Sequence, residues 1–149
     1  MPPESDLIKL YSGKILKMAA EPIYRERLSE PDASVTKRSP LCGSAITVDL
    51  NVESGVITHY GQEVRACALG QASSTIIGKA IVGRSLTEVQ RAYEELSDML
   101  KNEGPTPGKP FEELYMLKPA SEYKNRHASI LLALEATLAA FQQIEKNNC

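Results

Sequence analysis

Residues 62–81 change their hydrophobic spacing within a few positions, and this change limits the folds available to the chain. The stretch reads QEVRACALGQASSTIIGKAI. Before Cys67 the residues from Val56 to Val64 favour a strand, whereas the apolar residues after it recur at helical spacing. The helical face consists of Leu69, Ala72, Ile76 and Ala80. Cys67 is therefore predicted to lie where a strand passes into a helix, and the N–H groups and dipole of a helix start favour a thiolate.

A β-hairpin is predicted before this junction. From Ser44 onward apolar side chains recur at every second position, which is the spacing of a half-buried strand, and Asp49 belongs to the alternate set. Residues 53–55 form a turn that ends in glycine, which adopts a positive φ at low cost. A second strand covers residues 56–65. Because a hairpin alone is too small a sheet, we expect a third strand within residues 28–41.

Helices are predicted on both sides of the hairpin. They cover residues 5–19, 68–81, 85–103, 111–117 and 123–144. Ser85 and Glu88 form a capping box, and Pro119 is expected to end the short helical turns before it. This order of elements predicts one α+β domain over residues 1–149. Its small antiparallel sheet of about three strands carries four to five helices on one face.

The composition excludes several classes of protein. The formal net charge of −2 provides no basic surface for nucleic acid. No apolar run approaches the roughly 18 residues of a membrane span, and the first residues lack the apolar core of a signal peptide. We therefore expect a cytoplasmic protein that binds neither nucleic acid nor membrane. The three cysteines do not fit a disulfide framework, and Cys149 is predicted to be an exposed thiol after a polar run.

Two cysteines and one histidine form the candidate chemical site. Cys42 lies in a Pro-Leu-Cys-Gly turn before the hairpin, and antiparallel pairing brings it to the same end of the sheet as Cys67. His127 lies on the inward face of the last predicted helix. Thiolate and imidazole are ligands that suit zinc, iron or an iron–sulfur cluster. From the residues alone an alternative stays open, in which both cysteines are small buried hydrophobic residues and His127 is bonded to a carbonyl at the core edge.

Three strings of residues resemble one known family. They are PLCG at 40–43, ACALGQASS at 66–74 and RHASILL at 126–132. Together with the hairpin between the first two strings, they are similar to the IscU/SufU/NifU family of iron–sulfur cluster scaffolds over nearly the whole chain. The long span between Cys67 and His127, with its Gly- and Pro-rich insert, is similar to the SufU branch more than to IscU. The resemblance implies an α+β scaffold with a cluster or zinc site at one end.

The resemblance also implies a set of ligands. Cys42 and Cys67 match the first two cysteines of the family, and His127 matches the histidine that IscU proteins carry. Ser44 stands at the position of the family aspartate, and Ala128 at that of the third cysteine, where sulfur is expected to arrive. The expected site holds a [2Fe–2S] cluster, iron or zinc on Cys42, Cys67 and His127. Its fourth position is open to water, to Ser44 or to a ligand from a partner.

Two functions are compatible with this site. The first is a scaffold-like protein that transiently binds an iron–sulfur cluster, iron or zinc through two cysteines and a histidine. The alternative is a metal-free adaptor or regulator that binds a cysteine desulfurase or another assembly factor. The family implies a cysteine desulfurase and recipient apoproteins as partners, and we expect a monomer or a weak homo-oligomer. No acid–base pair and no nucleophile–base set is visible, so we do not expect an enzyme.

Overall fold

Three antiparallel strands and a set of helices follow one another in the computed structural model, which describes residues 13–20, 26–39 and 43–147. In chain order the elements are α2 (Gly13–Ala20), β1 (Ala33–Arg38), β2 (Ala45–Glu53), β3 (Val56–Arg65), α3 (Ala68–Ala80), α4 (Leu86–Asn102), the 3-10 helix η1 (Glu112–Glu122) and α5 (Lys124–Asn147). The third strand expected within residues 28–41 is β1. The predicted helix at residues 5–19 overlaps α2, and its first part lies outside the described residues.

The sheet has the strand order β1-β2-β3, and both pairs are antiparallel. Alternation along β2 produces a buried face, on which Ile46, Val48 and Leu50 are 2% exposed or less. The predicted turn is formed by Ser54 and Gly55, which both have positive φ. Two positive φ values give a turn whose twist matches that of the flanking strands, and this sets the register of the hairpin.

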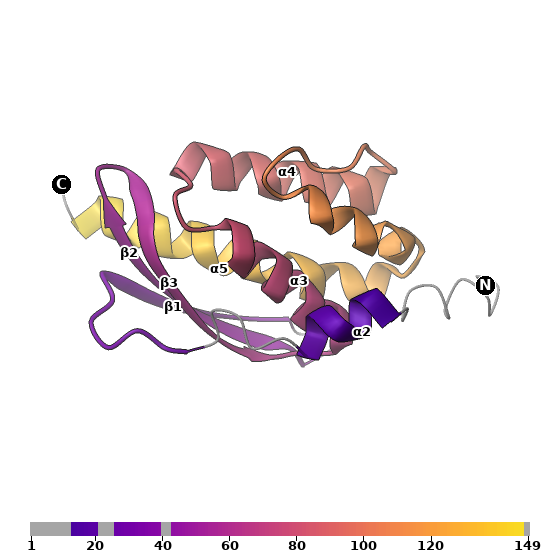
Figure 1. Cartoon of the computed structure of the whole chain (residues 1–149), viewed down its shortest axis with the longest axis horizontal. Helices are drawn as coiled ribbons and strands as arrows, with labels where there is room; N and C mark the ends of the chain where they lie inside the picture. The colour runs from indigo at the N-terminus through magenta and orange to yellow at the C-terminus, as the bar shows by residue number, and fades with distance from the viewer. Residues whose placement is uncertain (1–12, 21–25, 40–42, 148–149) are drawn as a thin grey trace.

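The helices form two layers on one face of the sheet (Figure 1). Helix α5 packs against β1 and β2, and α3 packs against α5 and β3. Helices α4 and η1 pack against α5, while α2 packs against α3. This arrangement confirms the α+β fold expected from the order of elements. No helix of the described residues is long and apolar enough to cross a membrane.

One predicted helix boundary is confirmed and another is wrong. The capping box that starts α4 is present, since the Ser85 N–H donates to Glu88 Oε1 (3.1 Å) and the Glu88 N–H donates to Ser85 Oγ (3.3 Å). The hydrogen bond from the Ser85 backbone is the main reason why the pKa of Glu88 is lowered. The expected stop at Pro119 is wrong, because η1 continues through that residue to Glu122. A proline removes only one N–H donor, and its fixed φ of about −65° lies within the range of a 3-10 helix, so η1 can pass through Pro119.

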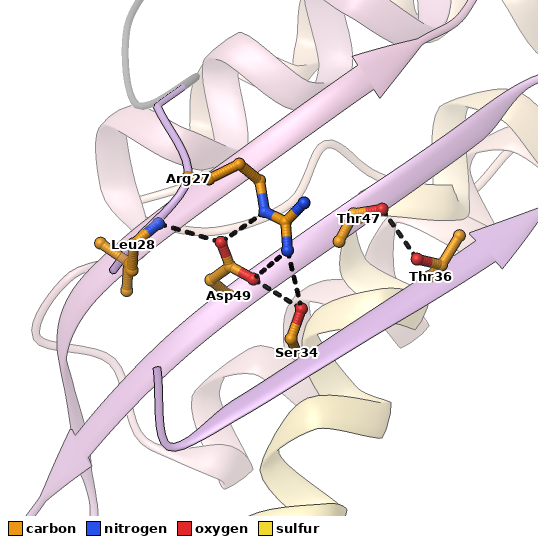
Figure 2. Close-up of polar contacts among 6 residues, drawn as sticks. All are labelled: Arg27, Leu28, Ser34, Thr36, Thr47 and Asp49. Carbon is orange, nitrogen blue, oxygen red and sulfur yellow. Dashed lines mark hydrogen bonds and ion pairs between the residues drawn. The ribbon is translucent and has the colours of Figure 1, made fainter. Parts of the chain in front are cut away.

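A polar cluster on the other face of the sheet holds the segment before β1 in place (Figure 2). The side chain of Asp49 accepts hydrogen bonds from Arg27 Nε (2.7 Å), the Leu28 N–H (3.0 Å) and Ser34 Oγ (2.6 Å). Asp49 is fully buried although its position in the alternation is the polar one. Gly61 is its register partner on β3, and the absence of a side chain there leaves space for the segment that carries Arg27.

Substitution of Gly61 by alanine is expected to lower the free energy of unfolding by about 1–3 kcal/mol, the usual cost of overpacking. A Cβ at this position would overlap the Glu26 carbonyl oxygen and lie 3.1 Å from the Leu28 nitrogen, and both are backbone atoms. Urea unfolding measures the loss. Gly13→Ala is the matched control, because a Cβ there has no heavy atom within 4 Å. Equal unfolding midpoints for the two variants would contradict the close approach of this segment.

Candidate metal centre

The start of α3 lies at the sheet end where all three strands meet in register. Arg38 of β1 pairs with Ala45 of β2, which pairs with Arg65 of β3. Cys67 follows two residues after β3 and is the N-cap residue of α3, with an extended backbone (φ −65°, ψ 170°). The predicted position of Cys67 between strand and helix is therefore confirmed. Cys67 is half-buried and packs against the hydrophobic core.

A pair of buried serine hydroxyls begins at the Cys67 sulfur. Ser129 Oγ of α5 is 3.6 Å from Cys67 Sγ and 3.0 Å from Ser44 Oγ. Ser44 and Ser129 are only 2% and 3% exposed. The contact requires Gly70 on α3, because a Cβ there would overlap the Ser129 hydroxyl and lie 2.8 Å from the Ala66 Cβ. The fold thus places Ser44 one hydroxyl away from Cys67.

His127 lies in the first turns of α5 and is 5% exposed, on the inward face that its spacing predicts. Its Nε2 is 2.9 Å from the Ala120 carbonyl oxygen and 3.1 Å from that of Ser121, at the end of η1. Carbonyl oxygens only accept, so these contacts assign the ring proton to Nε2. The lone pair is then on Nδ1, which is the one nitrogen of His127 able to bind a metal. A histidine whose second nitrogen donates to a carbonyl is the usual arrangement of a metal ligand.

Cys42 lies outside the described residues, and so does Cys149. The residue after Cys42 is Gly43, which has a φ of +69° and donates its N–H to the Ser39 carbonyl oxygen (3.1 Å). Within residues 13–20, 26–39 and 43–147, no three His, Cys, Asp or Glu side chains are close enough to hold a metal ion. That part of the chain contains two of the three expected ligands, Cys67 and His127. The structure does not bring these two into hydrogen-bonding contact.

A cavity of about 480 Å³ lies at the beginning of α5. His127 and Ala128 form part of its wall, together with Lys101 at the end of α4 and Lys124. Both lysines are exposed, so the cavity opens at the surface. Ala128 stands where the resemblance places a third cysteine, and its short side chain leaves space next to His127.

Ser129 and Gly70 were not among the predicted site residues. Their contribution depends on the packing of α5 against α3, which residue spacing within one helix does not reveal. One local signal was present, because Ser129 directly precedes the apolar run of residues 130–134. A polar side chain at a buried helical position needs a hydrogen-bond partner. The second hydroxyl of the pair, Ser44, is 85 residues away along the chain.

Fold and site together define a class, that of small α+β proteins that present a cysteine at one end of a three-stranded sheet. The model of the NifU-like N-terminal domain matches residues 10–146, and the chain belongs to this family. Thermotoga maritima has a relative, the iron–sulfur cluster assembly scaffold protein IscU, that is 26% identical over 137 residues. That match covers 92% of this chain and 96% of the relative. Family and relative indicate a scaffold-like protein of iron–sulfur cluster assembly.

Solved structures agree with the family. The N-terminal part of a nitrogen-fixing NifU-like protein from Brucella abortus has a TM-score of 0.92 and 39% identity, and the match covers 95% of this chain and 98% of that one. A SUF-system iron–sulfur cluster assembly scaffold from Fervidobacterium islandicum has a TM-score of 0.79 over 90% of this chain and 98% of that one. The latter is 17% identical, so it shows the shared fold alone.

Proposed function

We propose that the chain binds an iron–sulfur cluster, iron or zinc as a transient cargo through Cys42, Cys67 and His127. The observation that carries the proposal is the position of Cys67 at the N-cap of α3, half-buried and without a hydrogen bond from its side chain to the helix. The sulfur is therefore not engaged in capping the helix, and a cysteine binds metal as the thiolate. In this role residues 1–149 form one domain without a catalytic activity of its own.

The ligand set suits loading and release. Two thiolates balance one divalent cation, and a site with three protein ligands keeps one position exchangeable. Ser44 would have to leave its hydrogen bond with Ser129 to occupy that position. The cavity beside His127 and Ala128 opens at the surface, where water or a ligand from a partner would approach the histidine. His127 would bind through Nδ1 while its Nε2 keeps the two carbonyl contacts.

The proposed partners follow from the same role. A cysteine desulfurase would supply sulfur, and recipient apoproteins would take the cargo. Ala128 carries no thiol, so sulfur would have to arrive at another residue of the site or with the partner. We place this exchange in the cytoplasm, between a monomer or weak homo-oligomer of the chain and its partners, with a [2Fe–2S] cluster as the first candidate for the cargo.

A second candidate function is that of a metal-free adaptor for a desulfurase or another assembly factor. The observation in its favour is that the hydroxyl of Ser44, at the position of the family aspartate, is buried and bonded to Ser129. In that case the fold would be kept for partner binding and the cysteines for packing.

Elemental analysis of the chain purified without oxygen distinguishes the two functions. We expect iron with acid-labile sulfide, because thiolate and imidazole together suit iron and its clusters. The measurement gives iron, zinc and sulfide per chain. Zinc without sulfide would leave the site in place but would contradict the cluster as cargo. A chain without any metal, also after incubation with ferrous iron and sulfide, would replace the scaffold function with the adaptor.

A further inference from the structure

We propose that the hydroxyl pair Ser44–Ser129 donates a hydrogen bond to the metal-bound sulfur of Cys67, and that Ser44 acts through Ser129 rather than as a ligand. This inference rests on the proposed function, since it assumes that Cys67 binds a metal. It assigns positioning roles to two residues and removes Ser44 from the candidate ligands.

The direction of the hydrogen bonds follows from the chemistry of the sulfur. A metal-bound thiolate has no proton and only accepts, so Ser129 Oγ has to donate across the 3.6 Å contact. A serine hydroxyl has one proton and two lone pairs. Once Ser129 donates to sulfur, its oxygen can only accept from Ser44 across the 3.0 Å contact. The order of donation is therefore Ser44 to Ser129 to Cys67.

The surroundings of Ser129 hold its hydroxyl in this position. The side chain is 3% exposed, so water does not compete freely for the hydrogen bond. Gly70 allows the close approach of α5, because any Cβ there would overlap the Ser129 hydroxyl. The Ser73 hydroxyl of α3 donates to the Ile130 carbonyl of α5 (2.6 Å), which fixes the two helices relative to each other one residue beyond Ser129.

A hydrogen bond of this kind changes what the sulfur does as a ligand. It orients the thiolate, and loss of such a partner typically costs 10–100-fold in metal affinity. It also withdraws electron density from sulfur, which is one of the means by which proteins adjust the reduction potential of iron–sulfur clusters. Removal of the donor therefore raises the energy of the sulfur electrons and lowers the energy of sulfur-to-metal charge transfer.

The test uses Co²⁺ as the probe and the full chain as the protein. We expect Ser129→Ala to weaken Co²⁺ binding by about tenfold and to shift the sulfur-to-cobalt absorption band to longer wavelength. Ser44→Ala has a smaller effect of the same sign, because it weakens the Ser129 donor without removing it. The double variant loses less than the sum of the two single variants, since the hydroxyls of Ser44 and Ser129 are hydrogen-bonded to each other.

Thr137→Val is the matched control, because it also removes a buried hydroxyl from α5, one that donates to the Ala133 carbonyl (2.7 Å). It should leave the absorption band unchanged, and urea unfolding of each metal-free variant shows that the fold is intact. An unchanged band and affinity in Ser129→Ala would overturn the inference. So would additive losses in the double variant, which would make Ser44 an independent ligand. A wild-type chain that binds no Co²⁺ at all would instead overturn the proposed function, and this inference with it.

Discussion

Replacement of Cys67 by serine is expected to abolish metal binding and, in the same protein, to leave the metal-free fold as stable as before or more stable. The substitution removes one of the proposed thiolate ligands. A serine hydroxyl stays protonated and neutral near pH 7, so it does not replace the thiolate. Loss of a ligand should exceed the 10–100-fold effect of losing a partner around it. Helix α3 becomes more stable, because Cys67 is an N-cap residue without a side-chain hydrogen bond to α3 and a serine can make that bond. An N-cap serine raises the free energy of unfolding by about 0.5–1 kcal/mol relative to a residue that does not cap the helix.

Metal content per chain and urea unfolding of the metal-free protein measure these two effects separately. Cys42→Ser should lose metal in the same way, whereas Cys149→Ser is the control that keeps it. Equal metal content in all three variants would contradict the ligand set. A variant Cys67→Ser that loses metal because it unfolds is recognised by its unfolding midpoint, and the opposite signs of the two effects exclude that explanation.

Replacement of Asp49 by alanine is expected to lower the free energy of unfolding at pH 7 by about 2–3 kcal/mol, the scale of losing hydrogen bonds to a buried charged group. The carboxylate is fully buried and accepts from Arg27, Leu28 and Ser34. Its removal leaves the Leu28 N–H without this acceptor and opens a cavity. The value stays below that of a fully buried ion pair, because the Arg27 side chain is 46% exposed and keeps its hydration.

The contribution of Asp49 should also depend on pH. Burial alone raises the pKa of this carboxyl, but the hydrogen bonds from Arg27, Ser34 and the Leu28 N–H outweigh it and hold the pKa below its usual range. A carboxyl whose pKa is lower in the folded state stabilises the fold fully above its unfolded pKa of about 3.9. That stabilisation is lost as the pH falls through the folded pKa. The difference between wild type and Asp49→Ala should therefore shrink below about pH 4.

Urea unfolding at pH 7 and at pH 3 checks both statements. Asp32→Ala is the control, because its residue is exposed and its carboxylate accepts from the Val52 N–H of the same strand β2 (2.9 Å). It should cost less than about 1 kcal/mol. If Asp49→Ala lowers the free energy of unfolding by the same amount at both pH values, the charge of Asp49 does not contribute to stability.

Local patterns in the sequence determined most of the elements and the position of one proposed ligand, Cys67. The alternation in residues 44–65 predicted both strands of the hairpin, and the change of spacing at Cys67 predicted the N-cap of α3. These predictions succeed because strand and helix periodicities extend over a few consecutive residues. The stop expected at Pro119 was wrong, because η1 continues to Glu122. This 3-10 helix packs against α3, α4 and α5, and such packing is not visible in a local pattern.

Only the tertiary structure decided which residues surround the Cys67 sulfur and which lie buried on the other face of the sheet. Ser129 is 62 residues from Cys67 along the chain, and their contact depends on how closely α5 approaches α3 at Gly70. Asp49 has the spacing of an exposed strand residue, yet the segment with Arg27 covers it because Gly61 leaves the space. Periodicity states which side of an element a residue occupies. What lies on that side depends on packing between segments far apart in the sequence, which no local pattern contains.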